Sequence, residues 1–461
     1  MLTGWIFFAS VGILQAQQLA GEQKEVDSTS LGFRLLHKGA VHIHVRSFFM
    51  ATDNAAPLTD YAAWAVGAGL GYESPKIHGF QAGLTGFFIF NLYSTDLGVV
   101  DPLTKSASRY EIGLFDISNP SNKKDLDRLE DLYVKYSFSK TMLQLGRFEL
   151  NTPFINRQDG RMRGTIEEGA WFETKELKHL KMEGGWLWKI SPRSTIAWYN
   201  VEDSYGVYNS GLNELGSPSA YAGNITSDGI GLLGITYAPS ADFKMQLWEQ
   251  YAENVFNTSL IQTDVKWPLS KESKIQAGLM YIRQDALNDG GNINPLKSYI
   301  RKGSFSNVIS ARAGIIHRKL DIALNYTRIS DNGRFLMPRE WGREPFYTFM
   351  PRERNEGFAD LQAYTIACSY PFMNGKLKTT LSYGQFFLPD VKDVARNKYG
   401  MPSYQQINAD VKYYFDGSMK GLMIQLLSVY KGRMSDDYGN YKYVFNKVNM
   451  YNWSLMIDYM F

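Results

Sequence analysis

The last eleven residues of the chain alternate strictly between two kinds of side chain, and this period of two is the strongest constraint on the fold. Apolar and aromatic side chains occupy every second position, namely Tyr451, Trp453, Leu455, Ile457, Tyr459 and Phe461. The positions between them hold Asn452, Ser454, Met456, Asp458 and Met460. Because successive side chains of a β-strand point to opposite faces, the pattern predicts a strand with one apolar face.

The same alternation recurs along the chain. Val41, Ile43 and Val45 alternate with His42, His44 and Arg46, and residues 261–267, 320–327 and 407–415 repeat the pattern. Tight links lie at residues 74–78, 139–140, 191–193, 239–241, 269–272, 318–319, 372–374 and 416–419. Mostly longer, polar links lie at residues 51–59, 93–128, 151–179, 202–228, 254–256, 285–304, 331–360, 388–402 and 432–449. If residues 169–176 belong to the loop 151–179, these links connect about 18 strands.

The alternation does not say which face meets lipid, because a soluble barrel has the same period with its apolar face inward. The start of the chain indicates export, since residues 2–14 are mostly apolar and Ala16 suits cleavage. The usual basic segment is missing, as the first cation is Lys24, so a misplaced start codon or a packed helix remain alternatives. No later stretch reaches the ~18 apolar residues of a transmembrane helix.

The position of Phe461 decides the orientation of the two faces. An aromatic residue at the end of such a strand resembles the assembly signal shared by outer-membrane barrels. We therefore expect an all-β fold: a single transmembrane antiparallel β-barrel of about 18 strands, with long outer loops and short periplasmic turns. The expected division is a signal peptide at 1–16, a short lead-in at 17–38 and the outer-membrane barrel at 39–461. Its expected partners are the lipid bilayer and the outer-membrane assembly machinery.

Charge and metal-binding residues exclude several other classes of function. The 49 Lys and Arg residues nearly balance the 46 Asp and Glu residues, so no attraction to nucleic acid is implied. The single Cys368 excludes an internal disulfide and a multi-cysteine metal site. His42 and His44 share one strand face, but no third ligand is evident. We expect no metal and no cofactor.

Two further segments carry a family resemblance. Residues 145–150 read Leu-Gly-Arg-Phe-Glu-Leu and enter a loop that contains Asp-Gly-Arg-Met at 159–162. Residues 337–346 read Met-Pro-Arg-Glu-Trp-Gly-Arg-Glu-Pro-Phe. With these segments the chain resembles the OprD-type outer-membrane porins. The resemblance implies a monomeric barrel of eighteen strands with a narrow, basic-lined constriction made by inward-folded loops, and passage of small carboxylate-bearing solutes such as amino acids and peptides. The brief link at 191–193, between the apparent strands 181–190 and 195–201, departs from the family and suggests that an outer loop is lost.

The loop 151–179 is the best candidate for the constriction. It carries the three closely spaced arginines Arg157, Arg161 and Arg163. A guanidinium keeps its charge at any working pH and presents a fork that matches a carboxylate, so these residues suit an anionic solute in transit. The alternative is a solvated outer loop whose charges pair with one another.

The strands supply a second set of candidate residues. The inward phase of the alternation assigns a basic ladder to the lumen, made of Arg46, Lys244, Lys266, Lys274, Arg312 and Lys412. Asp264 and Asp410 are the acidic residues of the same phase. Such a ladder favours anions, whereas the alternative for each single residue is an ion pair that stabilises the barrel. The arginine-rich loop 331–360 is expected to fold as a cap, since its prolines restrict it and its rings can be buried.

The function expected from these features is that of an outer-membrane porin, a passive diffusion channel for small polar solutes that favours carboxylates. A structural or adhesive barrel with an occluded lumen is the alternative. An outer-membrane hydrolase is a weaker one, because it needs a histidine at the loop rim and only His179 lies in a long loop. We therefore expect no enzymatic activity.

Deleting Phe461 tests the assembly signal. Folded protein in the outer membrane should fall greatly while synthesis continues, because the assembly machinery would no longer recognise the last strand. Quantitative blotting of membrane fractions, with and without heating, measures this. Normal insertion of the shortened chain would contradict the role given to Phe461.

Overall fold

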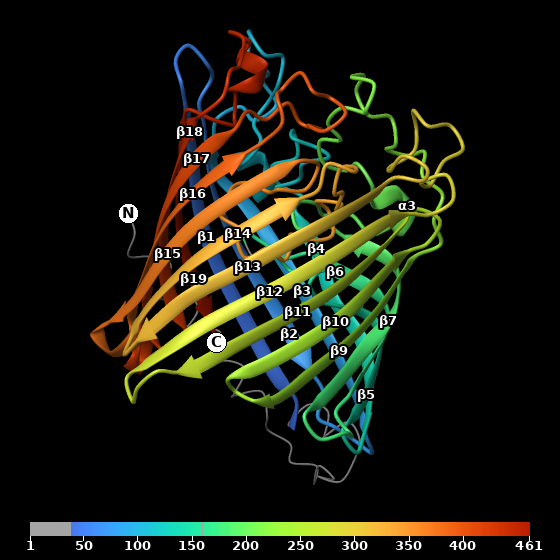
Figure 1. Cartoon of the computed structure of the whole chain (residues 1–461). Helices are drawn as coiled ribbons and strands as arrows, with labels where there is room; N and C mark the ends of the chain where they lie inside the picture. Colours follow the sequence, from blue (N-terminus) through green and yellow to red (C-terminus); the bar gives the residue numbers. More distant parts are fainter. Residues whose placement is uncertain (1–37, 159) are drawn as a thin grey trace.

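The computed structural model describes residues 38–158 and 160–461, which fold into one closed antiparallel barrel (Figure 1). Each barrel strand pairs with its neighbours in the chain, and β1 pairs with β19 to close the ring. Backbone hydrogen bonds of 2.9 Å in both directions join Ile43 and Phe461 at this seam. The expected signal peptide at 1–16 and most of the lead-in at 17–38 lie outside the described residues.

Eighteen strands form the wall, as expected from the sequence. They are β1 (Ala40–Asn54), β2 (Tyr61–Glu73), β3 (Phe80–Ser94), β4 (Asp127–Phe138), β5 (Thr141–Phe148), β6 (Ile166–Thr174), β7 (Leu180–Ser191), β9 (Ile230–Ser240), β10 (Phe243–Ala252), β11 (Phe256–Pro268), β12 (Ser273–Ala286), β13 (Phe305–His317), β14 (Leu320–Ile329), β15 (Leu361–Phe372), β16 (Leu377–Phe387), β17 (Tyr404–Tyr414), β18 (Leu422–Arg433) and β19 (Met450–Met460). A nineteenth strand, β8 (Tyr199–Asn200), has two residues and lies beside the end of β7. Helical segments are short: α3 (Val201–Ser204), η1 (Glu111–Leu114), η2 (Met373–Gly375), η3 (Gly417–Met419) and η4 (Tyr441–Tyr443).

The wall is apolar on its outer face. Leu324 of β14 is 58% exposed, whereas the next residue, Asn325, points inward and is buried. The same phase holds in β19, where Tyr451, Trp453, Leu455 and Ile457 are exposed and Asn452, Ser454, Met456 and Asp458 are buried. Exposed leucine, isoleucine and aromatic side chains such as these suit the hydrocarbon of a membrane and would be unfavourable in water. The inside–outside phase predicted from the sequence is therefore confirmed.

Connections differ in length at the two ends of the barrel (Figure 1). Short turns such as 139–140 and 318–319 lie at the lower end of the view, and long loops such as 95–126 and 330–360 at the upper end. Among the described residues, no helix is long and apolar enough to cross a membrane.

Two assignments made from the sequence are wrong. Residues 169–176 are not part of a loop, because β6 (Ile166–Thr174) pairs with both β5 and β7. Its alternation is hard to recognise, since Trp171 points into the lumen while the small Ala170 occupies the neighbouring position.

Omitting β6 also reversed the direction assigned to β7. Residues 191–193 are consequently not a short periplasmic turn. They begin a long loop, 192–229, at the same end as the other long loops, and Thr195–Val201 is not a wall strand. The chain therefore does not lack an outer loop at this point.

The long loops pack into the barrel and give it a hydrophobic core. Trp341 and Phe335 of the loop 330–360 are almost fully buried, as is Phe154 of the loop 149–165. Trp341 also donates a hydrogen bond of 2.9 Å to Ser204 Oγ of α3. Burying a large aromatic side chain contributes about 1.5–3 kcal/mol, so these loops are held as firmly as a domain core.

An arginine at Leu324 tests the outer face. Leu324→Arg should cost about 2–4 kcal/mol of folding free energy near the bilayer midplane, because the cation would be placed in hydrocarbon. Gln425→Arg is the matched control, since Gln425 points into the lumen and lies 2.7 Å from Asp410, which would pair with the new cation. Urea titration of folding into lipid vesicles measures both. Equal costs at the two positions would contradict the assigned phase.

Candidate functional site

A cavity of about 690 Å³ lies inside the barrel, between the strands and the inward-folded loops, and is called the lumen cavity below. Its lining is strongly basic. Among the described residues, the charged groups that line it are Arg109, Arg157, Arg161, Arg193, Arg339, Arg343, Arg352, Arg354, Lys412, Glu149, Glu353 and Asp410. Nine cations thus face three carboxylates. The near balance of charge in the whole chain does not extend to this cavity.

The loop 149–165, called the constriction loop below, is held inside the barrel by the late loop 330–360. The Asn156 backbone N–H donates to the Trp341 carbonyl at 3.1 Å. The Asn156 side chain accepts from the Arg343 N–H at 3.1 Å and donates to the Arg343 carbonyl at 2.9 Å. Three hydrogen bonds to one residue fix the two loops against each other, so both loops define the width of the path.

Two of the three arginines expected at the constriction line the lumen cavity. Arg157 Nη1 lies 3.3 Å from Glu149 Oε2. Arg161 is 6% exposed, and its Nη1 donates to the carbonyl of Gly160 at 2.7 Å. Burial, followed by repulsion from Arg352, lowers the pKa of Arg161 to about 9. Arg161 nevertheless remains a cation at neutral pH.

Arg163 lies elsewhere. It is not among the residues that line the lumen cavity, and it packs beside Arg128 of β4. Its Nη2 lies 3.4 Å from the Leu126 carbonyl, and burial together with Arg128 lowers the pKa of Arg163 to about 9. The structure therefore brings Arg157 and Arg161 together in the cavity and separates Arg163 from them.

The residues of the basic ladder occupy different environments. Lys412 lines the cavity, with its Nζ 3.7 Å from Asp410 Oδ2. Arg46 is fully buried, donates to Asp458 Oδ2 at 2.7 Å, and supports the constriction loop through a 2.8 Å hydrogen bond to the Arg161 carbonyl.

Neither Arg46 nor the other four ladder residues are among those that line the cavity. Lys274 pairs with Asp242 at 2.7 Å, and the Arg312 guanidinium stacks 4.8 Å from the centre of the Tyr347 ring. Lys244 and Lys266 are exposed near the short turns. These residues are spread along the wall rather than gathered in the cavity.

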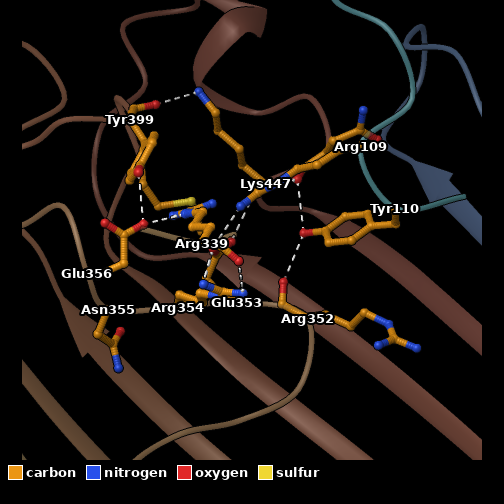
Figure 2. A network of polar contacts seen from close by, with 12 residues as sticks. Arg109, Tyr110, Arg339, Arg352, Glu353, Arg354, Asn355, Glu356, Tyr399 and Lys447 are labelled. Atoms are coloured by element: carbon orange, nitrogen blue, oxygen red, sulfur yellow. Dashed lines mark hydrogen bonds and ion pairs between the residues drawn. The ribbon is translucent and has the colours of Figure 1, made fainter. Parts of the chain in front are cut away.

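The late loop contains a buried carboxylate, Glu353, that ties three chain segments together (Figure 2). Its Oε1 accepts from Arg109 Nη2 at 2.8 Å, and its Oε2 accepts from Lys431 Nζ at 3.1 Å. Tyr110 adds a hydrogen bond of 3.0 Å to the Arg352 carbonyl. We call this group, made of Arg109, Tyr110, Glu353 and Lys431, the loop clasp. Burial alone would raise the pKa of Glu353, but Arg109 and Lys431 hold it well below its ordinary value.

A second buried pair continues this network. Arg339 forms an ion pair with Glu356, and Tyr399 Oη donates to the same carboxylate at 2.8 Å. Lys447 Nζ donates to the Tyr399 carbonyl at 2.8 Å, so the loops 388–403 and 434–449 are joined to the late loop (Figure 2). The expectation that the loop 331–360 folds as a packed cap agrees with these contacts.

Arg193 and Lys431 were missed by sequence reasoning. Arg193 was placed in a short turn at the opposite end of the barrel, because β6 was not recognised. Counting residues 166–174 as a strand restores the order of turns and loops and moves Arg193 to the end where the loops fold inward. No sequence signal marks Lys431, because its partner Glu353 lies far away in the chain.

A closed transmembrane barrel whose loops narrow a basic lumen defines the class of outer-membrane porins. Comparison with known families agrees. Residues 35–353 match the model of the outer membrane porin, OprD family, so the chain belongs to that family. It is accordingly a channel protein of the outer membrane.

Solved structures of porins share the fold over almost their whole length. Acinetobacter baumannii OccAB3 has a TM-score of 0.72 at 18% identity, over 92% of this chain and 99% of that one. Pseudomonas aeruginosa OccK9 (OpdG) has a TM-score of 0.72 at 16% identity, with the same coverage. Pseudomonas aeruginosa OpdK with vanillate has a TM-score of 0.69 at 14% identity, over 93% and 99%. No curated protein matches the sequence.

Neutralising Glu353 tests the loop clasp. Glu353→Gln removes the carboxylate that Arg109 and Lys431 share and should cost about 3–5 kcal/mol of unfolding free energy, the usual cost of leaving buried charges unpaired. The melting temperature in detergent and protease cleavage of the loop 330–360 measure the effect. Asp360→Asn is the control, because the Asp360–Arg328 pair is partly exposed and should contribute little. Unchanged stability in the Glu353 variant would contradict the assigned role.

Proposed function

We propose that this porin favours small solutes that carry carboxylate groups. The observation that carries the proposal is the excess of guanidinium groups on the lining of the lumen cavity. A passing anion gives up part of its hydration in such a narrow path, and fixed cations compensate for that loss. The planar fork of arginine also donates two parallel hydrogen bonds to a carboxylate, which an ammonium group cannot do.

The pairing of the three carboxylates strengthens this proposal. Glu353 is engaged by Arg109 and Lys431, Glu149 by Arg157, and Asp410 by Lys412. Each of these three acidic groups is already paired with a cation, which weakens its attraction for a passing cation, and the nine cations of the lining outnumber the three carboxylates. OpdK, one of the structural neighbours, was solved with vanillate, an aromatic carboxylate, which supports the same substrate class.

Arg157 and Arg161 are the proposed selective residues, with Lys412 and Arg46 as members of the ladder that contribute to the same field. We further propose that one chain forms the working channel, that the assembly machinery recognises Phe461, and that the chain has no catalytic role. The barrel closes within the chain through β1 and β19, and this closure supports a pore formed by one chain.

Replacing the two cavity arginines tests the selectivity. The double variant Arg157→Gln, Arg161→Gln keeps polarity and removes two charges, so reversal potentials in a salt gradient should shift toward cation preference. The shift should be larger in 0.1 M salt than in 1 M salt, because the screening length falls from about 10 Å to about 3 Å. Single channels in planar bilayers provide the measurement.

Arg163→Gln is the matched control, since Arg163 belongs to the same loop but not to the cavity lining. Its reversal potential should match that of the parent. A parent protein without conductance would favour the alternative of an occluded barrel. Equal reversal potentials in the parent and the double variant would refute the selective role of Arg157 and Arg161.

A further inference from the structure

Three arginines from three separate loops meet at one point of the lumen cavity. Arg161 belongs to the constriction loop, Arg193 to the loop 192–229 and Arg352 to the late loop. Their meeting point is Gly160. A methyl group on Gly160 would lie 3.6 Å from Arg193 Nη1 and 3.9 Å from Arg352 Nη1, and the Gly160 carbonyl accepts from Arg161 Nη1 at 2.7 Å. All three guanidinium groups therefore surround one residue.

Among the residues that the structure describes, neutral groups hold these side chains in place. Arg352 donates to Asn452 Oδ1 at 2.7 Å and to Ser454 Oγ at 2.5 Å. Arg193 Nη1 lies 3.4 Å from the Gln158 carbonyl. Within residues 38–158 and 160–461, none of the three arginines has a carboxylate oxygen within 4.0 Å. Arg161 Nε and Arg193 Nε are buried and have no hydrogen-bond partner.

The three buried guanidinium groups repel one another, and no carboxylate of the described residues is in contact with them. Burial lowers the pKa of Arg161 to about 9, of Arg352 to about 10, and that of Arg193 well below its ordinary value. Repulsion among these three guanidinium groups, called the trio below, lowers each pKa further. Arg352 acts on Arg161, Arg193 acts on Arg352, and Arg161 acts on Arg193. Because guanidinium stays protonated at neutral pH, the protein bears the cost of this repulsion unless an anion offsets it.

Two described carboxylates, Asp410 and Glu111, act electrostatically on these arginines without contacting them. Asp410 acts on Arg352, but its Oδ2 lies 3.7 Å from Lys412 Nζ. Glu111 acts electrostatically on Arg161 and Arg352, but it accepts hydrogen bonds from Thr52 Oγ1 at 2.5 Å and Ser108 Oγ at 2.9 Å. Burial raises the pKa of Glu111, which weakens its negative charge.

We propose that Arg161, Arg193 and Arg352 form a binding site for a doubly charged oxyanion group, such as a phosphate monoester or two neighbouring carboxylates on one solute. This inference rests on the proposed anion preference and narrows it. A single carboxylate can accept hydrogen bonds from more than one guanidinium, but its one negative charge offsets only one of the three positive charges. A phosphate monoester or a dicarboxylate brings two negative charges and at least three oxygens, so it offsets more of the repulsion and can accept from guanidinium groups on different sides.

Binding at this site gives the channel a saturable step. An anion that rests among the three arginines occupies the path, and the next solute enters only when it leaves. The site must therefore bind a dianion weakly enough for passage, and the measurable sign of such binding is interruption of the current carried by a smaller ion.

The test measures block of the chloride current through single channels of the full chain at pH 8. Inorganic phosphate, succinate and acetate are added in turn at constant ionic strength. We expect phosphate or succinate to reduce the current in a saturable way, with a half-blocking concentration at least tenfold below that of acetate. Stronger block by phosphate identifies phosphate-bearing solutes as the source of the dianion, and stronger block by succinate identifies dicarboxylates.

Substitutions at the trio test whether these arginines cause the block of the chloride current. Arg193→Gln should raise the half-blocking concentration of the better dianion about tenfold, and Arg193→Lys should raise it less, because a lysine keeps the charge but loses the fork. Arg396→Gln is the control, since Arg396 lies in the exposed part of the loop 388–403 and pairs with Asp393. Its half-blocking concentration should equal that of the parent.

Equal block by the three anions, or no block in a channel that is anion-selective, would overturn the binding site and leave the proposed function standing. A cation-selective parent would overturn the proposed function itself. The melting temperature in detergent gives a second measurement that needs no current. Phosphate or succinate should raise the melting temperature of the parent more than acetate does, and a rise equal to that in acetate would overturn the site.

Discussion

Backbone hydrogen bonding in hydrocarbon is the constraint on which this structure depends. A strand that crosses a membrane has no water to satisfy its N–H and C=O groups, so every strand needs two neighbours and the sheet must close. The pairing of β1 with β19, from His44 opposite Met460 to Asn54 opposite Met450, meets this requirement. Once the ring is closed, each strand has one face toward lipid and one toward the lumen, and the polar face of a strand such as β19 is turned inward.

The closed wall alone does not make a selective channel. An eighteen-strand barrel is wide, and its interior is polar. Here the loops reduce that width, because they pack on one another through buried rings and through ion pairs such as Glu353 with Arg109 and Lys431. A buried ion pair gives modest net stability, but breaking one is costly, so such pairs fix the loops in one arrangement. The position of the cavity arginines therefore depends on contacts between loops that are distant in sequence.

The difference between the barrel wall and the inward-folded loops explains which features could be predicted from the sequence. Strand phase is a local property with a period of two, and the assignments of Val41, Leu324 and Ile457 to the outer face are confirmed. The number of wall strands is also confirmed, although omission of β6 was offset by an extra strand at 195–201. β6 was not recognised because Trp171 points inward, where the alternation predicts a polar residue.

The packing of the loops depends on contacts between segments that are distant in sequence, such as those of Gly160 with Arg193 and Arg352. No local sequence pattern predicts such contacts. Of the residues proposed from the sequence for the constriction, Arg157 and Arg161 line the cavity, while Arg163 lies against Arg128.

The separation of wall and lining has a consequence for how such channels diversify. Each arginine of the trio is carried by its own loop, and each loop begins and ends at the rim of the barrel. A change in one loop can therefore alter which solute passes without disturbing the pairing of any strand. The architecture of the wall can be inherited almost unchanged while the loops vary in sequence and length. Porin structures that share 14–18% of their residues with this chain can therefore still superimpose over nearly its whole length.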